Sequence, residues 1–97
     1  MLNSRQRAQL RAMANSYDTI VHIGKDGIKE QTIKQIVDAL EKRELIKLRV
    51  LETAPYTSRE AADIVSREAS CDVVQVIGSR FIVYKESKNN KTIKLVK

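Results

Sequence analysis

The fold is decided by residues 19–28, which read Thr-Ile-Val-His-Ile-Gly-Lys-Asp-Gly-Ile. The first half, residues 19–23, is rich in β-branched side chains and predicts a strand. Gly24 and Gly27 then form a Gly-x-x-Gly turn, in which glycine permits a tight path through positive φ. A helical pattern follows at once, so free N–H groups and the positive end of a helix dipole face the turn. Such a unit suits an anion carried on a chain, such as a nucleic-acid phosphate.

The turn and its flanks carry charges of both signs. Lys25 adds a positive charge, and Lys29 is expected in the first turn of the helix, whereas Asp26 places a negative charge inside the loop. A plain tight turn between strand and helix is the alternative interpretation of two glycines at this spacing. The longer dinucleotide fingerprint and the P-loop are both absent. A nucleotide-binding enzyme is therefore a poor fit.

Length and composition restrict the class of protein. A chain of 97 residues makes one domain, here residues 1–97. No apolar run approaches the roughly 20 residues of a membrane span, and the first residues form a polar helical pattern, unlike a signal peptide. Cys71 is the single cysteine and has no partner for an internal disulfide, which agrees with a reducing compartment. We expect a cytoplasmic protein that does not bind membranes.

The net charge of +6 is concentrated at the two ends of the chain. Residues 1–15 carry three arginines and no acid, and residues 85–97 carry five lysines against Glu86. Residues 16–84 hold ten basic and eleven acidic residues. A balanced middle with basic ends indicates a polyanionic partner, with solubility as the alternative reason for the charge.

Hydrophobic periodicity and capping signals predict seven elements. Helices are expected over residues 4–15, 29–43 and 57 or 58–69, and strands over residues 19–23, 45–51, 72–77 and 80–85. Asn3 or Ser4 can cap the first helix, and Thr57-x-x-Glu60 resembles a capping box. Gly78-Ser79 predicts a two-residue hairpin turn of type II′. Residues 92–96 predict either a short edge strand or a mobile tail.

The element order is therefore αβαβαββ. Strands separated by single helices favour parallel pairing through right-handed crossovers, and the final hairpin is antiparallel. The expected fold class is α/β: a two-layer α/β sandwich with a four-stranded mixed sheet. Apolar residues alternate with Lys47 and Arg49 along strand 45–51, so one face of the strand is apolar and the other is partly basic. We therefore expect a sheet covered on one side.

Residues that carry enzyme chemistry are scarce. His22 and Cys71 belong to no cluster with metal-ligand spacing, and nothing favours a Cys–His nucleophilic pair. We expect no metal, no cofactor, no catalytic residue and no small-molecule substrate, so the protein is not an enzyme. No strand carries the paired aromatics that stack RNA bases, so backbone contacts should dominate in any RNA complex. Arg80 and Tyr84 share one side of their strand and can add one stacking contact.

Several segments in order resemble a known family. A basic N-terminal helix comes first, followed by Ile-Val-His-Ile-Gly-Lys-Asp-Gly-Ile at 20–28 and Glu-Leu-Ile-Lys at 44–47. Val-Val-Gln-Val-Ile-Gly at 73–78 and Phe-Ile-Val-Tyr at 81–84 complete the pattern. The chain resembles the YhbY-like family, the stand-alone bacterial form of the CRM (chloroplast RNA splicing and ribosome maturation) domain. The match covers a core of about residues 2–85 and leaves 86–97 as a basic C-terminal extension.

The resemblance implies an RNA-binding domain similar in fold to the C-terminal domain of translation initiation factor three. In that family the Gly-x-x-Gly loop is compared with the RNA-contacting loop of KH domains, which here implies Gly24, Lys25, Asp26 and Gly27. Bacterial stand-alone members are associated with precursors of the large ribosomal subunit, and plant relatives bind group II introns. Asp26 departs from the basic or neutral residue that an RNA clamp favours, which moves weight to the neighbouring basic residues.

We therefore expect a monomeric RNA-binding protein that contacts ribosomal precursor RNA and assists large-subunit assembly. The expected RNA-binding residues are Gly24, Lys25, Asp26, Gly27, Lys29, Lys34, Arg5, Arg7, Arg11 and His22. The arginines of the first helix can instead be plain solvated side chains, and His22 a partly buried strand residue. Two other functions stay open: a small basic protein that coats DNA or RNA, and a protein–protein adaptor without a nucleic-acid role.

Overall fold

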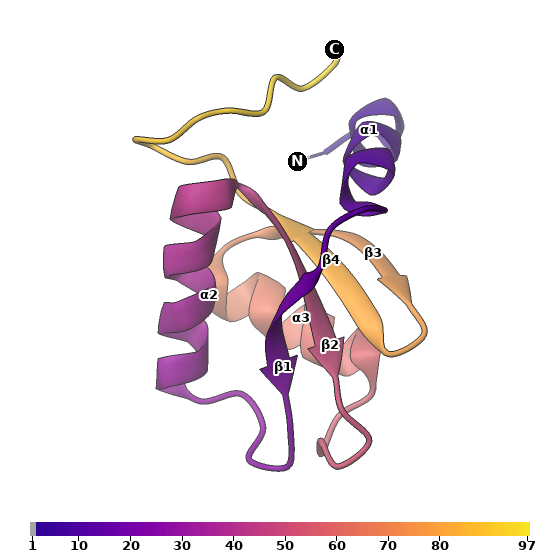
Figure 1. The fold of residues 1–97 in the computed structure, drawn as a ribbon, viewed down its shortest axis with the longest axis vertical. Helices are drawn as coiled ribbons and strands as arrows, with labels where there is room; N and C mark the ends of the chain where they lie inside the picture. Colours follow the sequence, from indigo (N-terminus) through magenta and orange to yellow (C-terminus); the bar gives the residue numbers. More distant parts are fainter. Residues whose placement is uncertain (1) are drawn as a thin grey trace.

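The computed structural model in Figure 1 describes residues 2–97 and has the expected αβαβαββ order. Its elements are α1 (Ser4–Ala14), β1 (Thr19–Ile23), α2 (Glu30–Arg43), β2 (Leu45–Val50), α3 (Ser58–Ala69), β3 (Asp72–Ile77) and β4 (Arg80–Tyr84). The four strands form one sheet in the order β1-β2-β4-β3. β1 runs parallel to β2, and β4 is antiparallel to both β2 and β3. The predicted mixed α/β sheet is therefore confirmed.

Local capping chemistry sets the ends of these elements. The side chain of Asn3 caps α1, and Thr57 and Glu60 form the predicted capping box at the start of α3. Gly78 has a φ of 58°, the positive value that the first position of a II′ hairpin turn requires. Lys29 is the residue before α2 rather than part of its first turn, and its backbone N–H donates to the Thr32 hydroxyl.

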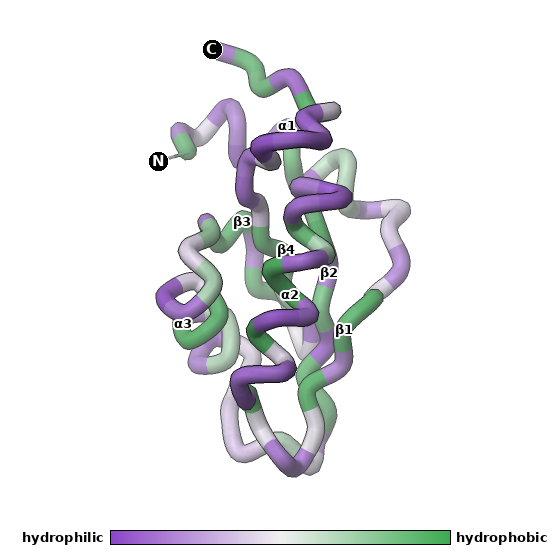
Figure 2. The backbone as a smooth tube through the Cα atoms, turned by 90° about the vertical axis from the view of Figure 1, so that its left-hand side faces the viewer, coloured by the Kyte–Doolittle hydropathy of each residue, from purple (hydrophilic) through white to green (hydrophobic). Residues whose placement is uncertain are grey.

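The main core lies between the sheet and the layer formed by α2 and α3. Its strand residues alternate along β2 and β4 and include Ile46, Leu48, Phe81 and Val83. They pack against fully buried residues of the two helices such as Leu40 and, on α3, Ala61, Ala62 and Val65. The outward side of α2 is hydrophilic in Figure 2, as expected of a helix that covers a sheet with one apolar stripe. None of the helices in residues 2–97 is long and apolar enough to cross a membrane.

The opposite face of the sheet is covered at one end only. α1 packs there through Leu10 and Ala14, against Leu45, Ile82 and Tyr84 of the strands. Figure 1 shows α1 above the upper end of the sheet, while the lower part of that face carries no helix. α1 therefore forms a partial third layer on the two-layer sandwich and leaves half of one sheet face open. Tyr84 is only 4% exposed beneath α1, so the predicted stacking contact through Tyr84 is wrong.

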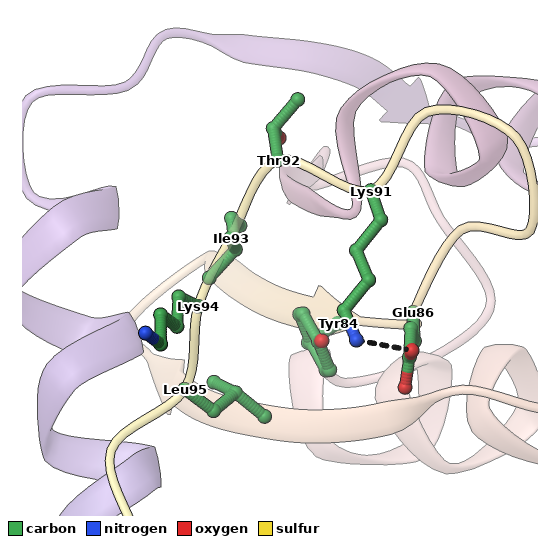
Figure 3. Close-up of a pocket in the computed structure, with 7 residues that line it drawn as sticks. All are labelled: Tyr84, Glu86, Lys91, Thr92, Ile93, Lys94 and Leu95. Atoms are coloured by element: carbon green, nitrogen blue, oxygen red, sulfur yellow. Dashed lines mark ion pairs between the residues drawn. The ribbon is translucent and has the colours of Figure 1, made fainter.

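The C-terminal segment after β4 is neither a strand nor a free tail. It crosses back over the sheet, where Ile93 is buried in the same cluster as Leu10 and Tyr84. Gln9 of α1 pairs with its backbone twice, donating to the Lys94 carbonyl and accepting from the Val96 N–H. Figure 3 shows the surface hollow beneath this segment, crossed by the Lys91–Glu86 ion pair at 2.9 Å.

Glu44 anchors this segment from the end of α2. Its buried carboxylate accepts the backbone N–H groups of Ser87, Thr92 and Ile93 at 2.7–2.8 Å. Burial raises the pKa of Glu44, but these hydrogen bonds outweigh that effect and the pKa is lowered. Glu44 has a φ of 65° at a position where glycine is usual. The anchoring of residues 87–93 explains why a carboxylate occupies it.

Candidate nucleic-acid interface

The Gly24–Gly27 loop is a closed turn at the lower end of the sheet in Figure 1. The Gly27 N–H donates to the Gly24 carbonyl at 3.0 Å, which closes a four-residue turn around Lys25 and Asp26. The Leu51 N–H donates to the Ile23 carbonyl at 2.9 Å and ties the turn to the β2–α3 loop. The turn is therefore held on both sides by backbone hydrogen bonds and presents Lys25 and Asp26 to solvent.

The two glycines have different roles. Gly27 has a φ of 73°, whereas Gly24 lies outside the positive-φ region, so the expectation that both glycines use positive φ is wrong for Gly24. A Cβ atom on Gly27 would stand 2.9 Å from the Tyr56 hydroxyl. A Cβ atom on Gly24 would meet its nearest neighbour, Leu51, at an ordinary 3.6 Å. The space above Gly27 is thus occupied by Tyr56 and is not open to a ligand.

Acidic groups reduce the attraction of this loop for phosphate. α2 begins at Glu30, so a carboxylate already stands in the first turn, where the helix dipole favours an anion. Exposed Asp26 lies beside exposed Lys25, and exposed Lys29 precedes Glu30. The loop and the start of α2 therefore carry two cations and two anions, so their own charges cancel.

The structure places the predicted arginines of α1 and Lys34 of α2 in two regions away from the loop. α1, with Arg5, Arg7 and Arg11, lies at the opposite end of the molecule from the loop (Figure 1). The longest dimension of the molecule is 38 Å. Arg5 and Arg11 are exposed, while half-buried Arg7 lines a polar hollow at the edge of β3. Lys34 is exposed on α2, in the layer on the other side of the sheet. These side chains do not form one site with the loop.

His22 is the predicted residue that connects the loop to a larger surface. It is exposed on the open face of the sheet, two residues before Gly24, with its Nε2 atom 3.4 Å from the Thr19 hydroxyl. Arg49 of β2 lies directly beside it, and Arg80 of β4 lies directly beside Arg49. The alternation along residues 45–51 predicts the side of the strand on which Arg49 lies, but no local pattern in the sequence brings these three residues together.

Cys71 and His22 do not form a catalytic pair. Cys71 is buried with the helix-side core, whereas His22 is on the opposite, open face. Burial raises the pKa of the Cys71 thiol to about 12, so a thiolate nucleophile is not populated near neutral pH. No group of three or more His, Cys, Asp or Glu side chains is placed to hold a metal within residues 2–97.

Comparison with known proteins agrees with this architecture. A family model described as "CRS1 / YhbY (CRM) domain" matches residues 2–85. The "Probable RNA-binding protein YqeI" of Bacillus subtilis is 40% identical over 98% of this chain and 99% of its own length. An "RNA-binding protein" of Haemophilus influenzae is 29% identical over 93% of this chain and 91% of its own.

A solved structure has the same fold. The solution structure of SAV1595 from Staphylococcus aureus superimposes with a TM-score of 0.82 and 47% sequence identity. It covers 99% of this chain and 100% of the other chain. The overall fold of the chain is therefore one that has already been seen by experiment.

Proposed function

The chain belongs to the CRS1 / YhbY (CRM) domain family, and from that premise we propose that it is an RNA-binding protein that contacts ribosomal RNA. The observation that carries the proposal is the family match over residues 2–85, together with two relatives, matched over 98% and 93% of the chain, that are named as RNA-binding proteins. The finer role is assistance of large-subunit assembly, which the resemblance to stand-alone bacterial CRM domains implies.

The mechanism is binding without chemistry. Exposed cations neutralise RNA phosphates, and the displaced counterions supply a large part of the affinity. Lys25 and Lys29 act at the loop, His22 acts beside it, and the exposed arginines of α1 act at the far end of the molecule. Neutralisation of about five phosphates on a single strand gives a log–log salt slope of roughly −3.5.

The test is a titration of labelled large-subunit ribosomal RNA fragments at two salt concentrations, with duplex DNA as competitor. We expect the wild type to bind RNA, with affinity that falls steeply as salt rises. A Gly24→Asp/Lys25→Glu variant should bind more weakly. The matched control is Gln35→Glu/Lys42→Glu, which makes the same change in charge at two exposed positions of α2.

Two results would contradict the proposal, and a third would move the binding site away from the loop. Binding to DNA at least as tight as to RNA would favour a general nucleic-acid coating protein. Absence of binding at moderate salt would favour the adaptor function. Equal binding by the loop variant and its control would remove the loop from the site and leave RNA binding itself intact. A Lys25→Glu single variant repeats the test without a new side chain at Gly24.

A further inference from the structure

We propose that the open half of the sheet binds a single-stranded RNA segment, with Arg49, Arg80 and Lys47 on its phosphates and Tyr17 stacked on one base. The inference rests on the proposed function, because it assumes an RNA ligand. The binding site is a new one, since none of these four residues belongs to the loop, to α1 or to α2. This surface, named here the open face, consists of the outward side chains of β1, β2 and β4 that α1 leaves uncovered.

Strand pairing aligns the basic side chains of the open face in one row. His22 pairs with Arg49, and Arg49 pairs with Arg80. Residues directly opposite one another in adjacent strands project to the same face, with strands about 4.8 Å apart. Lys47 projects from β2 beside this row, one step toward α1. The sheet therefore presents three permanent cations and a histidine on one flat surface.

These cations are not neutralised by neighbours. The ion pairs within residues 2–97 are Arg59–Asp63, Arg67–Glu68 and Lys91–Glu86, and none involves a strand residue. Asp72 is the single acid in the four strands, and it lies opposite buried Tyr84 in the register of β3 and β4, at the end of the sheet that α1 covers. Asp18, before β1, is the one acid that borders the open face at the hollow described next. The positive charge of this face is thus available to an external polyanion.

Tyr17 supplies an aromatic surface at the border of the same face. It is 36% exposed, while Tyr56 is half-buried and Tyr84 is buried. Tyr17 lines a hollow of about 360 Å³ together with Asp18, Thr19, Lys47 and Arg80. An aromatic ring beside two cations is the combination that binds an unstacked base and its phosphates. This geometry favours single-stranded RNA over a duplex, whose bases are already stacked.

The position of the open face also connects two regions that are otherwise apart. Its lower row ends beside the Gly24–Gly27 loop, because His22 lies two residues before Gly24 on β1. Its upper border is α1, which carries Arg11 on the same side of the sheet. One strand of RNA across the open face therefore reaches both regions without bending around the molecule.

The experiment measures binding of a short fluorescein-labelled single-stranded RNA by anisotropy at several salt concentrations. An Arg49→Ala/Arg80→Ala variant should bind more weakly, and its log–log salt slope should be shallower by about 1.4, the value for two lost phosphate contacts. The control, Lys42→Ala/Arg67→Ala, removes two exposed charges from the helix layer on the other side of the sheet. It should bind more tightly than the open-face variant and keep a slope closer to that of the wild type.

Stacking by Tyr17 has a separate readout. Tyr17→Ala should weaken binding by about fivefold or more, whereas Tyr17→Phe, which keeps the ring, should bind like the wild type. The chain has no tryptophan, so RNA should quench tyrosine emission in the wild type, and Tyr17→Phe should lose this quenching. Thermal unfolding of each variant separates a loss of contact from a loss of fold.

The outcomes distinguish the two proposals. If the wild type binds RNA and the open-face variant matches its control in affinity and slope, the open face is not the site and the proposed function stands. If the wild type binds no RNA, both proposals fail. If Tyr17→Ala binds like the wild type, or a hairpin duplex binds as tightly as the single strand, the assignment of a stacked base is overturned.

Discussion

Substitution by alanine is expected to destabilise the domain at Gly27 but not at Gly24. Gly27→Ala places an L side chain at a φ of 73°, which costs about 1–2 kcal/mol for the left-handed conformation. Its Cβ would also stand 2.9 Å from the Tyr56 hydroxyl, so Tyr56 must shift. Reduced freedom of the unfolded chain offsets about 0.4–1 kcal/mol. The net expectation is a loss of about 1 kcal/mol, or a Tm lower by about 4–8 °C for a domain of this size.

Gly24→Ala is the matched comparison. Its Cβ would contact Leu51 at 3.6 Å and Thr53 at 3.9 Å, both ordinary distances, and its φ is not in the positive range. The unfolded-state term then dominates, so we expect unchanged stability or a gain of up to about 0.5 kcal/mol. Urea unfolding followed by far-UV circular dichroism measures both variants.

Tyr56→Phe separates the two costs at Gly27. It removes the hydroxyl nearest to the added Cβ and leaves the backbone conformation unchanged, so a double-mutant cycle isolates the contact. We expect Gly27→Ala to cost less in the Tyr56→Phe background than in the wild type. Equal losses for Gly24→Ala and Gly27→Ala, or a larger loss for Gly24→Ala, would refute this account of the loop.

Three further expectations concern the buried groups. Glu44→Gln should lower the free energy of unfolding at pH 7 by about 2 kcal/mol, since at least one buried N–H loses its acceptor. Because folding lowers the pKa of Glu44, its ionised carboxylate stabilises the fold at pH values above its ordinary pKa of 4.5. This stabilisation is lost as the pH falls through the pKa of the folded state, so the urea midpoints of wild type and variant should converge in acid. Cys71 should resist a thiol-specific disulfide reagent at pH 8 and react when urea unfolds the chain; rapid reaction in the native state would contradict its burial. Removal of residues 86–97 should destabilise the domain by more than Glu44→Gln does, because it also exposes Tyr84; an unchanged melting curve would show that the segment is dispensable.

The sequence predicts most elements because their ends are set by neighbouring residues. β1 and β3 have the predicted bounds, and the other elements agree to within about one residue. Each signal lies within a few positions, as in the reciprocal hydrogen bonds between Thr57 and Glu60. Contacts between distant residues leave no such local pattern. The approach of Tyr56 to Gly27 and the anchoring of residues 87–93 by Glu44 belong to this class.

The charged surface of the sheet also depends on contacts between distant residues, and it bears directly on function. Residues 16–84 are nearly neutral as a sum, so the sequence alone points to the basic ends of the chain as the binding surface. In the folded molecule the strands carry a net positive charge, with Lys47, Arg49 and Arg80 against Asp72, whereas α2 and α3 together hold six acids and five bases. Strand pairing then brings Arg49 and Arg80, 31 positions apart, into direct opposition. A sum along the chain averages over both sides of a sheet, so a basic surface made by pairing becomes visible only when the register is known.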